Sequence, residues 1–138
     1  MGKALNYLGI ARMSGNIELG EENAKALVKA GKARLLLLAS DASDGVKKRA
    51  EGYVFGFHTP IVELPFDRTE LGGAVGRNLC AIAAVRDLGL AKSLADALAA
   101  EFGERYAPVA QTLDEKQARL TARKAAKGGK TGKRRKSE

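Results

Sequence analysis

The stretch ELGEENAKALVKAGKARLLLLASD, residues 18–41, contains the two segments that decide the fold. Ala24, Leu27 and Val28 lie at helical spacing behind two acidic residues, which predicts a helix of about ten residues. Gly31 follows at the position where a left-handed helix end requires a glycine. The next segment, ARLLLLAS, is short and apolar throughout, which is typical of a strand buried on both faces. The sequence therefore predicts a polar helix packed on the central strand of a sheet.

Patterns typical of helices and strands alternate through most of the chain. Three further strands are predicted, in the stretches IEL, PIVEL and LCAIAAV. Asp67 and Glu70 have the spacing of a capping box and predict the start of a short helix, which Gly76 ends. Asp87 is predicted to cap the last helix of the domain. This alternation predicts an α/β fold in which helices cover both faces of the sheet. The predicted inner faces of the first, third and last helices are formed by Ala4, Leu5, Leu8 and Ala11, by Val46, Ala50, Val54 and Phe57, and by Ala91, Leu94, Leu98 and Phe102.

The positive charge is concentrated at the carboxyl end. Residues 119–138 hold nine Lys or Arg and one acid, which accounts for the whole net charge of +8. We therefore divide the chain into a domain at 1–104 and a basic, largely disordered tail at 105–138. Within the tail, LDEKQARLTARKAAK is expected to become helical only when it is bound, and GGKTGKRRKSE to be disordered. A basic tail favours a polyanionic partner, although it can also serve solubility alone.

The sequence contains no pattern that marks a membrane protein, a secreted protein or a metal site. No apolar run reaches the roughly 18 residues that span a bilayer. The first residues, MGKALNYLGIARMSG, lack the apolar centre of a signal peptide. We therefore expect a cytoplasmic monomer with no membrane partner. Cys80 and His58 are the only residues of their types, so neither a disulfide nor a metal site is predicted, and Cys80 is expected to be a core residue.

Catalysis and nucleotide binding are not indicated either. In LGGAVGRN, Gly73 and Gly76 match only part of a dinucleotide fingerprint, and no phosphate-loop lysine follows. Gly72 and Gly73 are explained more simply by close packing of a helix. The sequence shows no carboxylate pair and no serine–histidine arrangement that suggests a reaction. We therefore expect no enzyme activity and no cofactor.

Three stretches in this order carry a resemblance to a known family. They are LGIARMSGNIELGEENAKALVKAGKARLLLLASDAS at residues 8–43, HTPIVEL at 58–64 and ELGGAVGRNLCAIAAVRDLGLAKSL at 70–94. The chain resembles the kink-turn RNA-binding superfamily of ribosomal proteins, of the L-seven-Ae and L-thirty-e type, and most of all its bacterial YlxQ-like branch. The resemblance implies a three-layer α/β/α sandwich with a small mixed central sheet. It also implies binding of structured RNA, such as ribosomal RNA or another kinked RNA, with the ribosome or translation factors as further partners.

The resemblance implies an RNA site built from two places. One is the amino end of the second predicted helix, and the other is the loop before LCAIAAV. The family's motif at the helix start is Gly-x-Asn-Glu, with a lysine three residues after the Glu. The matching positions here hold Gly20, Glu22, Asn23 and Ala26. Asn and Glu are therefore exchanged in this chain, and the lysine is displaced or absent.

The chemistry of these residues agrees with that implication. A helix start offers free N–H groups and a partial positive charge to a phosphate or a base edge. A Glu accepts hydrogen bonds from exposed base edges, and an Asn both donates and accepts. Alternatively, Glu21 and Glu22 only complement the helix dipole, which contributes ~0.3–1 kcal/mol each. The candidate RNA-contacting residues are Gly20, Glu21, Glu22, Asn23, Lys25, Lys29, Lys32, Gly76, Arg77, Asn78 and Leu79.

Two other functions remain open on the sequence alone. The protein could be an interaction adaptor that keeps the fold but has lost specific RNA recognition, with Glu22 and Ala26 as signs of the loss. It could also be the substrate-binding domain of an RNA-modifying enzyme, which would need a catalytic partner. Binding assays with a kink-turn RNA, a plain duplex and a single strand distinguish the first of these from an RNA-binding protein.

Overall fold

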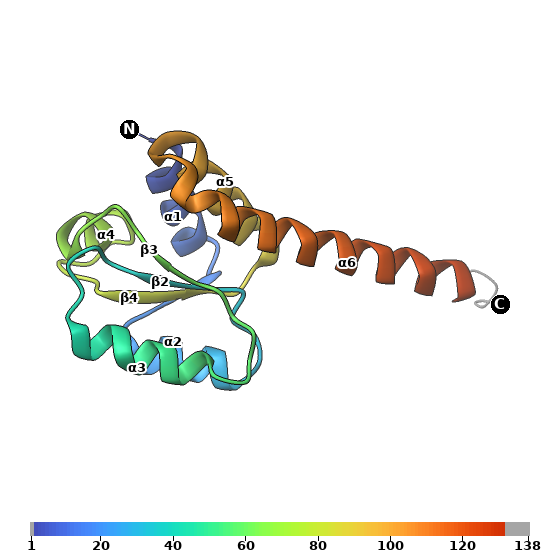
Figure 1. Cartoon of the computed structure of the whole chain (residues 1–138), viewed down its shortest axis with the longest axis horizontal. Coiled ribbons are helices and arrows are strands. Elements are labelled where there is room, and N and C mark those ends of the chain that lie inside the picture. Colours follow the sequence, from blue (N-terminus) through green and yellow to red (C-terminus); the bar gives the residue numbers. More distant parts are fainter. Residues whose placement is uncertain (1, 132–138) are drawn as a thin grey trace.

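The computed structural model describes residues 2–131 of the chain. In this part, helices and strands alternate as the sequence predicts, and they form a three-layer α/β/α sandwich (Figure 1). The helices are α1 (Lys3–Met13), α2 (Glu21–Lys29), α3 (Asp44–Val54), α4 (Arg68–Ala74), α5 (Leu88–Phe102), the 3-10 helix η1 (Glu104–Tyr106) and α6 (Ala107–Thr131). The strands are β1 (Ile17–Leu19), β2 (Leu35–Leu38), β3 (Ile61–Glu63) and β4 (Ile82–Val85).

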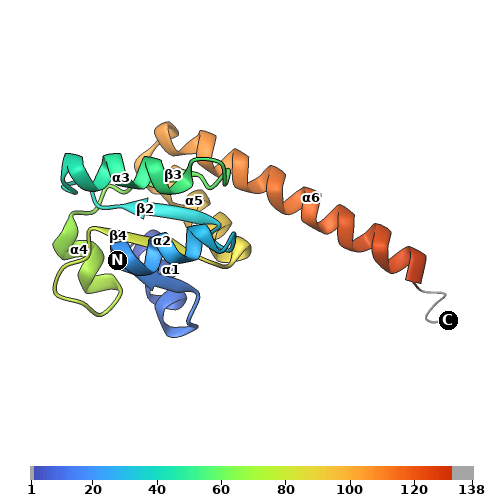
Figure 2. The same cartoon turned by 90° about the horizontal axis from the view of Figure 1, so that it is seen from below.

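The four strands form one small mixed sheet in the order β1-β4-β2-β3. β4 pairs antiparallel with both β1 and β2, whereas β2 and β3 run parallel. β2 and β4 are therefore the central strands, and the view from below in Figure 2 shows them side by side. This arrangement confirms the predicted fold class, including the position of the leucine strand at the centre of the sheet.

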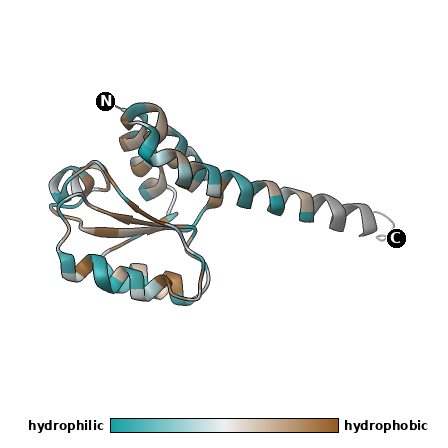
Figure 3. Ribbon diagram, viewed as in Figure 1, coloured by the Kyte–Doolittle hydropathy of each residue, from teal (hydrophilic) through white to brown (hydrophobic). Residues whose placement is uncertain are grey.

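The side chains of β2 alternate between two separate cores. Leu35 and Leu37 pack with residues of α1, α4 and α5 on one face of the sheet. Leu36 and Leu38 pack with residues of α2 and α3 on the other face. Because successive side chains of a strand point to opposite faces, four consecutive leucines supply both cores at once. Figure 3 shows the result, with hydrophobic strands in the middle and hydrophilic residues on the outer helix faces.

The helix ends follow the local sequence signals. Asp67 and Glu70 form a reciprocal capping box at the start of α4. The side chain of Asp87 accepts a hydrogen bond from the N–H of Leu90 at the start of α5. Gly31 has a φ of 74°, so the left-handed backbone predicted after α2 is present. These features confirm the predicted boundaries.

Two aromatic residues depart from their predicted places on inner helix faces. α3 ends at Val54, and Gly56 then turns the chain with a φ of 84°. Phe57 consequently lies outside the helix and is 38% exposed, while the unpredicted Tyr53 occupies the buried position. Phe102 is 41% exposed and contacts Phe66 edge to face, with ring centroids 5.4 Å apart. The placement of Phe57 was wrong because helical spacing alone does not reveal where a helix ends.

The carboxyl-terminal segment differs most from the sequence-based expectation. Residues 107–131 form α6, a long helix that leaves the body of the molecule (Figure 1), where a largely disordered tail from 105 was expected. Tyr106 and Leu113 belong to the core, and Val109 and Ala110 pack against it. These contacts stabilise the first turns of α6 in the unbound chain. The apolar residues of this segment are too weakly spaced for the contacts to be predicted from the sequence. Residues 132–138 of the predicted tail lie outside the described residues.

Within residues 2–131, no helix is both long and apolar enough to cross a membrane.

Candidate functional site

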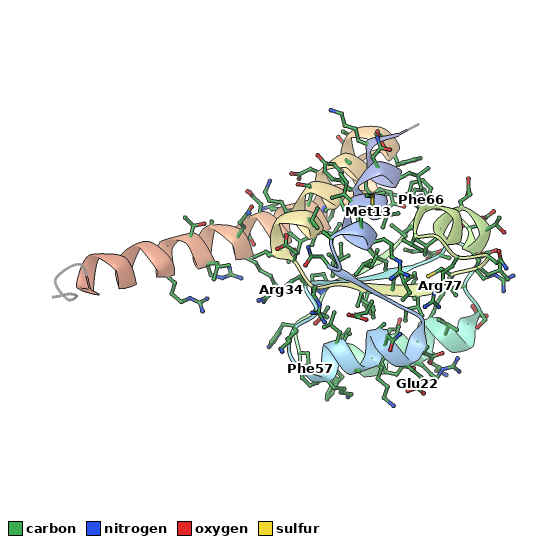
Figure 4. All side chains as sticks on the ribbon, turned by 180° about the vertical axis from the view of Figure 1, so that it is seen from behind. Met13, Glu22, Arg34, Phe57, Phe66 and Arg77 are labelled. Atoms are coloured by element: carbon green, nitrogen blue, oxygen red, sulfur yellow. The ribbon has the colours of Figure 1, made fainter. Side chains whose placement is uncertain are left out.

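The two predicted halves of the site lie at the same end of the sheet. β1 runs antiparallel to β4, with Leu19 opposite Ala83. The N–H of Gly20 donates to the carbonyl of Ile82 over 3.0 Å. The start of α2 is therefore held beside the start of β4, which the loop 76–79 immediately precedes. Figure 4 shows Glu22 and Arg77, which represent these two places, at the same end of the sheet.

Gly20 gives the start of α2 an open backbone. Its φ of 89° is in the region that favours glycine, and a Cβ at this position would meet no described atom within 4 Å. As the N-cap residue, Gly20 supplies no side-chain cap to the first turn of α2. The N–H groups of this turn can therefore donate to an external anion or base edge, as the helix-start hypothesis requires.

The Glu21 side chain is bound to α3. Its carboxylate accepts hydrogen bonds from Arg49 Nε at 2.5 Å and Nη2 at 3.1 Å, and from the Tyr53 hydroxyl. The hydrogen bond from Arg49 and then that from Tyr53 hold the pKa of Glu21 below its usual range. The structure thus places Glu21 as a link between α2 and α3, a pairing across 28 residues for which the sequence contains no local signal.

Glu22 and Asn23 are exposed at the start of α2. Asn23 Nδ2 donates to the carbonyl of Leu19 over 3.0 Å, which orients this exposed side chain. Among residues 2–123, whose side chains the structure describes, Glu22 forms no ion pair. Both side chains can therefore offer acceptor oxygens to a ligand at this end of the sheet.

A shallow hollow of about 230 Å³ lies beside Asn23, between α2 and the edge strand β1. Lys32 and Arg86 bring two cations to it, and Arg86 Nη2 donates to Glu18 Oε2 over 3.1 Å. Sequence reasoning missed Arg86. The only signal that could have found it is the pairing of β1 with β4, which brings residues 68 positions apart together.

Lys25 and Lys29 lie on the side of α2 that faces α3. The Lys25 ammonium is 5.6 Å from the centre of the Tyr53 ring, and the Lys29 ammonium is 5.4 Å from that of Phe57. Contacts of this kind contribute about 0.5–1 kcal/mol at exposed sites. These two lysines therefore lie along the side of α2 that faces α3, with Lys29 at the end of the helix away from Gly20, whereas Lys32 belongs to the hollow on its other side.

The loop Gly76–Leu79 presents three exposed side chains next to Gly20. Arg77, Asn78 and Leu79 are exposed, and Leu79 is 57% accessible. The loop folds back on α4, because the N–H of Arg77 donates to the carbonyl of Gly72 over 2.7 Å. Gly76 has a φ of 78°, as expected for the predicted helix end. The backbone of the loop is thereby held while its side chains stay accessible.

Gly72 makes this loop conformation possible. A Cβ at Gly72 would lie 2.8 Å from the Arg77 carbonyl oxygen and 2.9 Å from that of Asn78. These are backbone atoms, so the loop would have to move. A Cβ at Gly73 meets no described atom within 4 Å. The predicted close packing is therefore confirmed for Gly72 but not for Gly73.

We expect Gly72→Ala to displace the loop and destabilise the protein by about 1–3 kcal/mol, as overpacking usually does. Gly73→Ala is the matched control, and it should be neutral or stabilising because alanine is the better helix former. Thermal unfolding of the two variants measures the difference. Equal melting temperatures would show that the loop does not pack on α4 in this way.

Cys80 is part of the core beneath the site. It is 5% exposed, and its thiol donates to the carbonyl of Ile82 over 3.4 Å. Burial raises the pKa of the thiol, which disfavours the reactive thiolate. The prediction of a core cysteine is confirmed. Within the described residues, no three His, Cys, Asp or Glu side chains are grouped so that they could hold a metal ion.

Comparison with known proteins places the chain in a family. No family model matches it. The RNA-binding protein YlxQ of Enterococcus faecium is 32% identical over 75 residues, which cover 54% of this chain and 72% of that protein. A structure of a protein of unknown function from Bacillus halodurans is 28% identical with a TM-score of 0.67, covering 71% of this chain and 98% of that one. The Giardia lamblia 15.5kD RNA binding protein shares the fold, at 22% identity and a TM-score of 0.57, over 69% of this chain and 84% of that one. The sequence match shows that this chain belongs to the YlxQ-like family.

Proposed function

We propose that this protein is a non-catalytic RNA-binding protein that recognises structured, kink-turn-like RNA, and that it acts at the ribosome or in translation. The observation that carries the proposal is the junction of β1 and β4. The hydrogen bond from Gly20 to Ile82 brings the open start of α2 and the loop 76–79 together at one end of the sheet. One ligand can therefore contact both places at once.

The groups exposed at this junction are complementary to an RNA that displays both base edges and phosphates. The N–H groups at the start of α2 suit an anionic oxygen. Glu22 accepts from base amino groups, and the held Asn23 amide offers an acceptor beside them. Arg77 is exposed in the loop and can stack on a base or donate two hydrogen bonds to a phosphate. Such base edges are accessible in kinked or looped RNA and hidden in a regular duplex.

The names of the relatives support RNA as the ligand. The Enterococcus faecium relative is called an RNA-binding protein, and so is the Giardia lamblia protein of the same fold. The residues of the described part suggest no reaction, because its cysteine is buried and no metal-binding cluster is present there. Binding without catalysis is therefore the simplest function for this site.

The test is a gel shift with three RNAs of equal length: one with a kink-turn, one plain duplex and one single strand. We expect the kink-turn RNA to bind most tightly. Equal binding of the kink-turn and the duplex would contradict recognition of RNA structure. Absence of binding to all three would favour the adaptor function, for which Glu22 and Ala26 at the family's Asn and Lys positions are the supporting observation.

Restoring the family's motif should increase selectivity for the kink-turn. The triple variant Glu22→Asn, Asn23→Glu, Ala26→Lys changes three exposed positions of α2. Since one directional hydrogen bond to a base edge is worth about 1–3 kcal/mol, we expect the ratio of kink-turn to duplex affinity to rise at least about tenfold. If the unaltered protein already has the same ratio, its own Glu22-Asn23 order is fully competent.

A further inference from the structure

A second, strongly basic cleft lies where α6 leaves the body of the molecule. It has a volume of about 320 Å³ and is lined on the body side by Arg34 and by His58 and Thr59 of the loop before β3. α6 contributes Lys116, Arg119 and Arg123 to its other wall. Figure 4 shows Arg34 between the body and α6, at the end of the sheet opposite to Glu22 and Arg77.

Specific contacts of η1 and α6 hold α6 against the body beside the cleft. The Tyr106 hydroxyl donates to the carbonyl of Glu63 over 2.9 Å, and Leu113 is fully buried in the core. Lys116 Nζ donates to the carbonyl of His58 over 2.6 Å. His58 has a φ of 57°, which is uncommon for a residue other than glycine. The three contacts fix the direction of α6 as far as its cationic face.

The positive charge of the cleft is not balanced within the described residues. No carboxylate of this part of the chain lines it. Three acids close in sequence to its lining residues have partners elsewhere: Asp87 caps α5, Asp114 pairs with Lys92 over 3.6 Å, and Glu115 accepts a hydrogen bond from Gln111 Nε2 over 3.4 Å. Burial, and after it the charges of Arg119 and Arg34, lower the pKa of Lys116 below its usual range. An anion in the cleft would relieve this repulsion.

The cations of α6 form a row along their wall of the cleft. Lys116, Arg119 and Arg123 follow each other at intervals of three and four residues, so they share one face of α6 and extend over ~10 Å of its axis. A small anion would contact only part of this row, whereas the whole row suits a polymer with a charge at every repeat. The chemistry favours a nucleic-acid backbone over a free phosphate.

The cleft and the site at the start of α2 lie at opposite ends of β4. The N–H of Arg34 donates to the carbonyl of Val85, the last residue of β4, over 2.7 Å. Gly20 donates to Ile82, the first residue of the same strand. The two ends are separated by ~10 Å of strand, so a ligand must be longer than the kinked element itself to contact both.

We propose that this cleft is a second RNA-contacting surface, which holds the phosphate backbone of a helical arm extending from the kinked RNA at the start of α2. The proposal rests on the proposed function. In this proposal, Arg34 and the cations on one face of α6 strengthen RNA binding. They do not select a base sequence, because phosphate contacts carry no sequence information.

The experiment compares two RNAs that share the same kink-turn, one of them with an arm longer by one helical turn. The variants are Arg34→Glu on the body, Arg119→Glu on α6, and Lys48→Glu as a charge-matched control. Lys48 is an exposed lysine of α3 to which the structure assigns no hydrogen bond or ion pair within residues 2–131. Dissociation constants are measured by fluorescence anisotropy at two salt concentrations, beside the site variant Asn23→Ala, Arg77→Ala.

Arg34→Glu and Arg119→Glu should each weaken binding of the long-armed RNA about tenfold and reduce its salt slope by about one. Neither should weaken binding of the short-armed RNA more than Lys48→Glu does. If both variants bind the long-armed RNA as tightly as Lys48→Glu does while the site variant loses affinity, the proposal that the cleft binds RNA is wrong and the proposed function stands. If they weaken the long-armed RNA while the site variant binds normally, the cleft stands and the site at α2 is refuted. If the unaltered protein binds neither RNA, both proposals are wrong.

Discussion

Leu36→Ala should lower the free energy of unfolding by ~2–5 kcal/mol. Leu36 is fully buried in the core beneath α2 and α3, where it packs with Ala24, Leu27 and Val28 of α2. Truncation to alanine removes apolar packing and leaves a cavity that the rigid sheet cannot fill by relaxing. The measurement is the midpoint and slope of chemical unfolding, followed by circular dichroism.

Leu79→Ala is the matched control for that substitution. It makes the same chemical change at a leucine that is 57% exposed, so we expect a change within about 0.5 kcal/mol. A Leu36→Ala variant as stable as Leu79→Ala would show that β2 is not the central strand. The comparison therefore tests whether the four-leucine strand β2 is the buried centre of the sheet.

Asn23→Ala combined with Arg77→Ala should weaken binding of kink-turn RNA by about 1–3 kcal/mol for each side chain removed. The two side chains come from the two places that the pairing of β1 with β4 brings together. Both are exposed, and the hydrogen bond from Asn23 to Leu19 is a single tie at a helix end, so circular dichroism should not change. Anisotropy titrations with the kink-turn RNA and the duplex measure the effect.

The control for this pair is Asn6→Ala combined with Arg12→Ala. It removes one Asn and one Arg from exposed positions of α1, which covers the opposite face of the sheet. We expect its affinity to match that of the unaltered protein. Equal reductions of affinity in the two double variants would mean that binding depends on overall charge, and the proposed site would be wrong.

Much of the fold could be predicted from local sequence alone. Four consecutive leucines between Gly31 and Asp41 indicate a strand buried on both faces, and the structure supplies both cores from them. The capping box of Asp67 with Glu70 locates the start of α4 to the residue. These signals succeed because each depends on neighbours within a few residues. The resemblance to a family added the layer order and the mixed sheet, which local patterns do not specify.

The composition of the candidate site could be predicted only in part. Gly20, Asn23 and the loop 76–79 were identified from the sequence, and the structure brings them to one end of the sheet. Glu21 was placed among them by its position alone, yet its carboxylate is bound to Arg49 and Tyr53. A charged side chain pairs with whichever group lies close to it in the folded protein. The partners of Glu21 are 28 and 32 residues away in the sequence, so no local pattern predicts the pairing.

The sequence by itself determined the leucine strand, the starts of α4 and α5, the end of α2 and the location of the positive charge. Tertiary structure decided what Lys116, Arg119 and Arg123 face. Residues 107–131 contain too few apolar residues to predict a stable helix, but Leu113 and Tyr106 are buried in the core, and Lys116 is hydrogen-bonded to His58. Those contacts join segments more than 40 residues apart, and burial of a few side chains is enough to order the helix that carries them. Arg34 and the cations of α6 therefore meet in one cleft only because the chain folds back on itself.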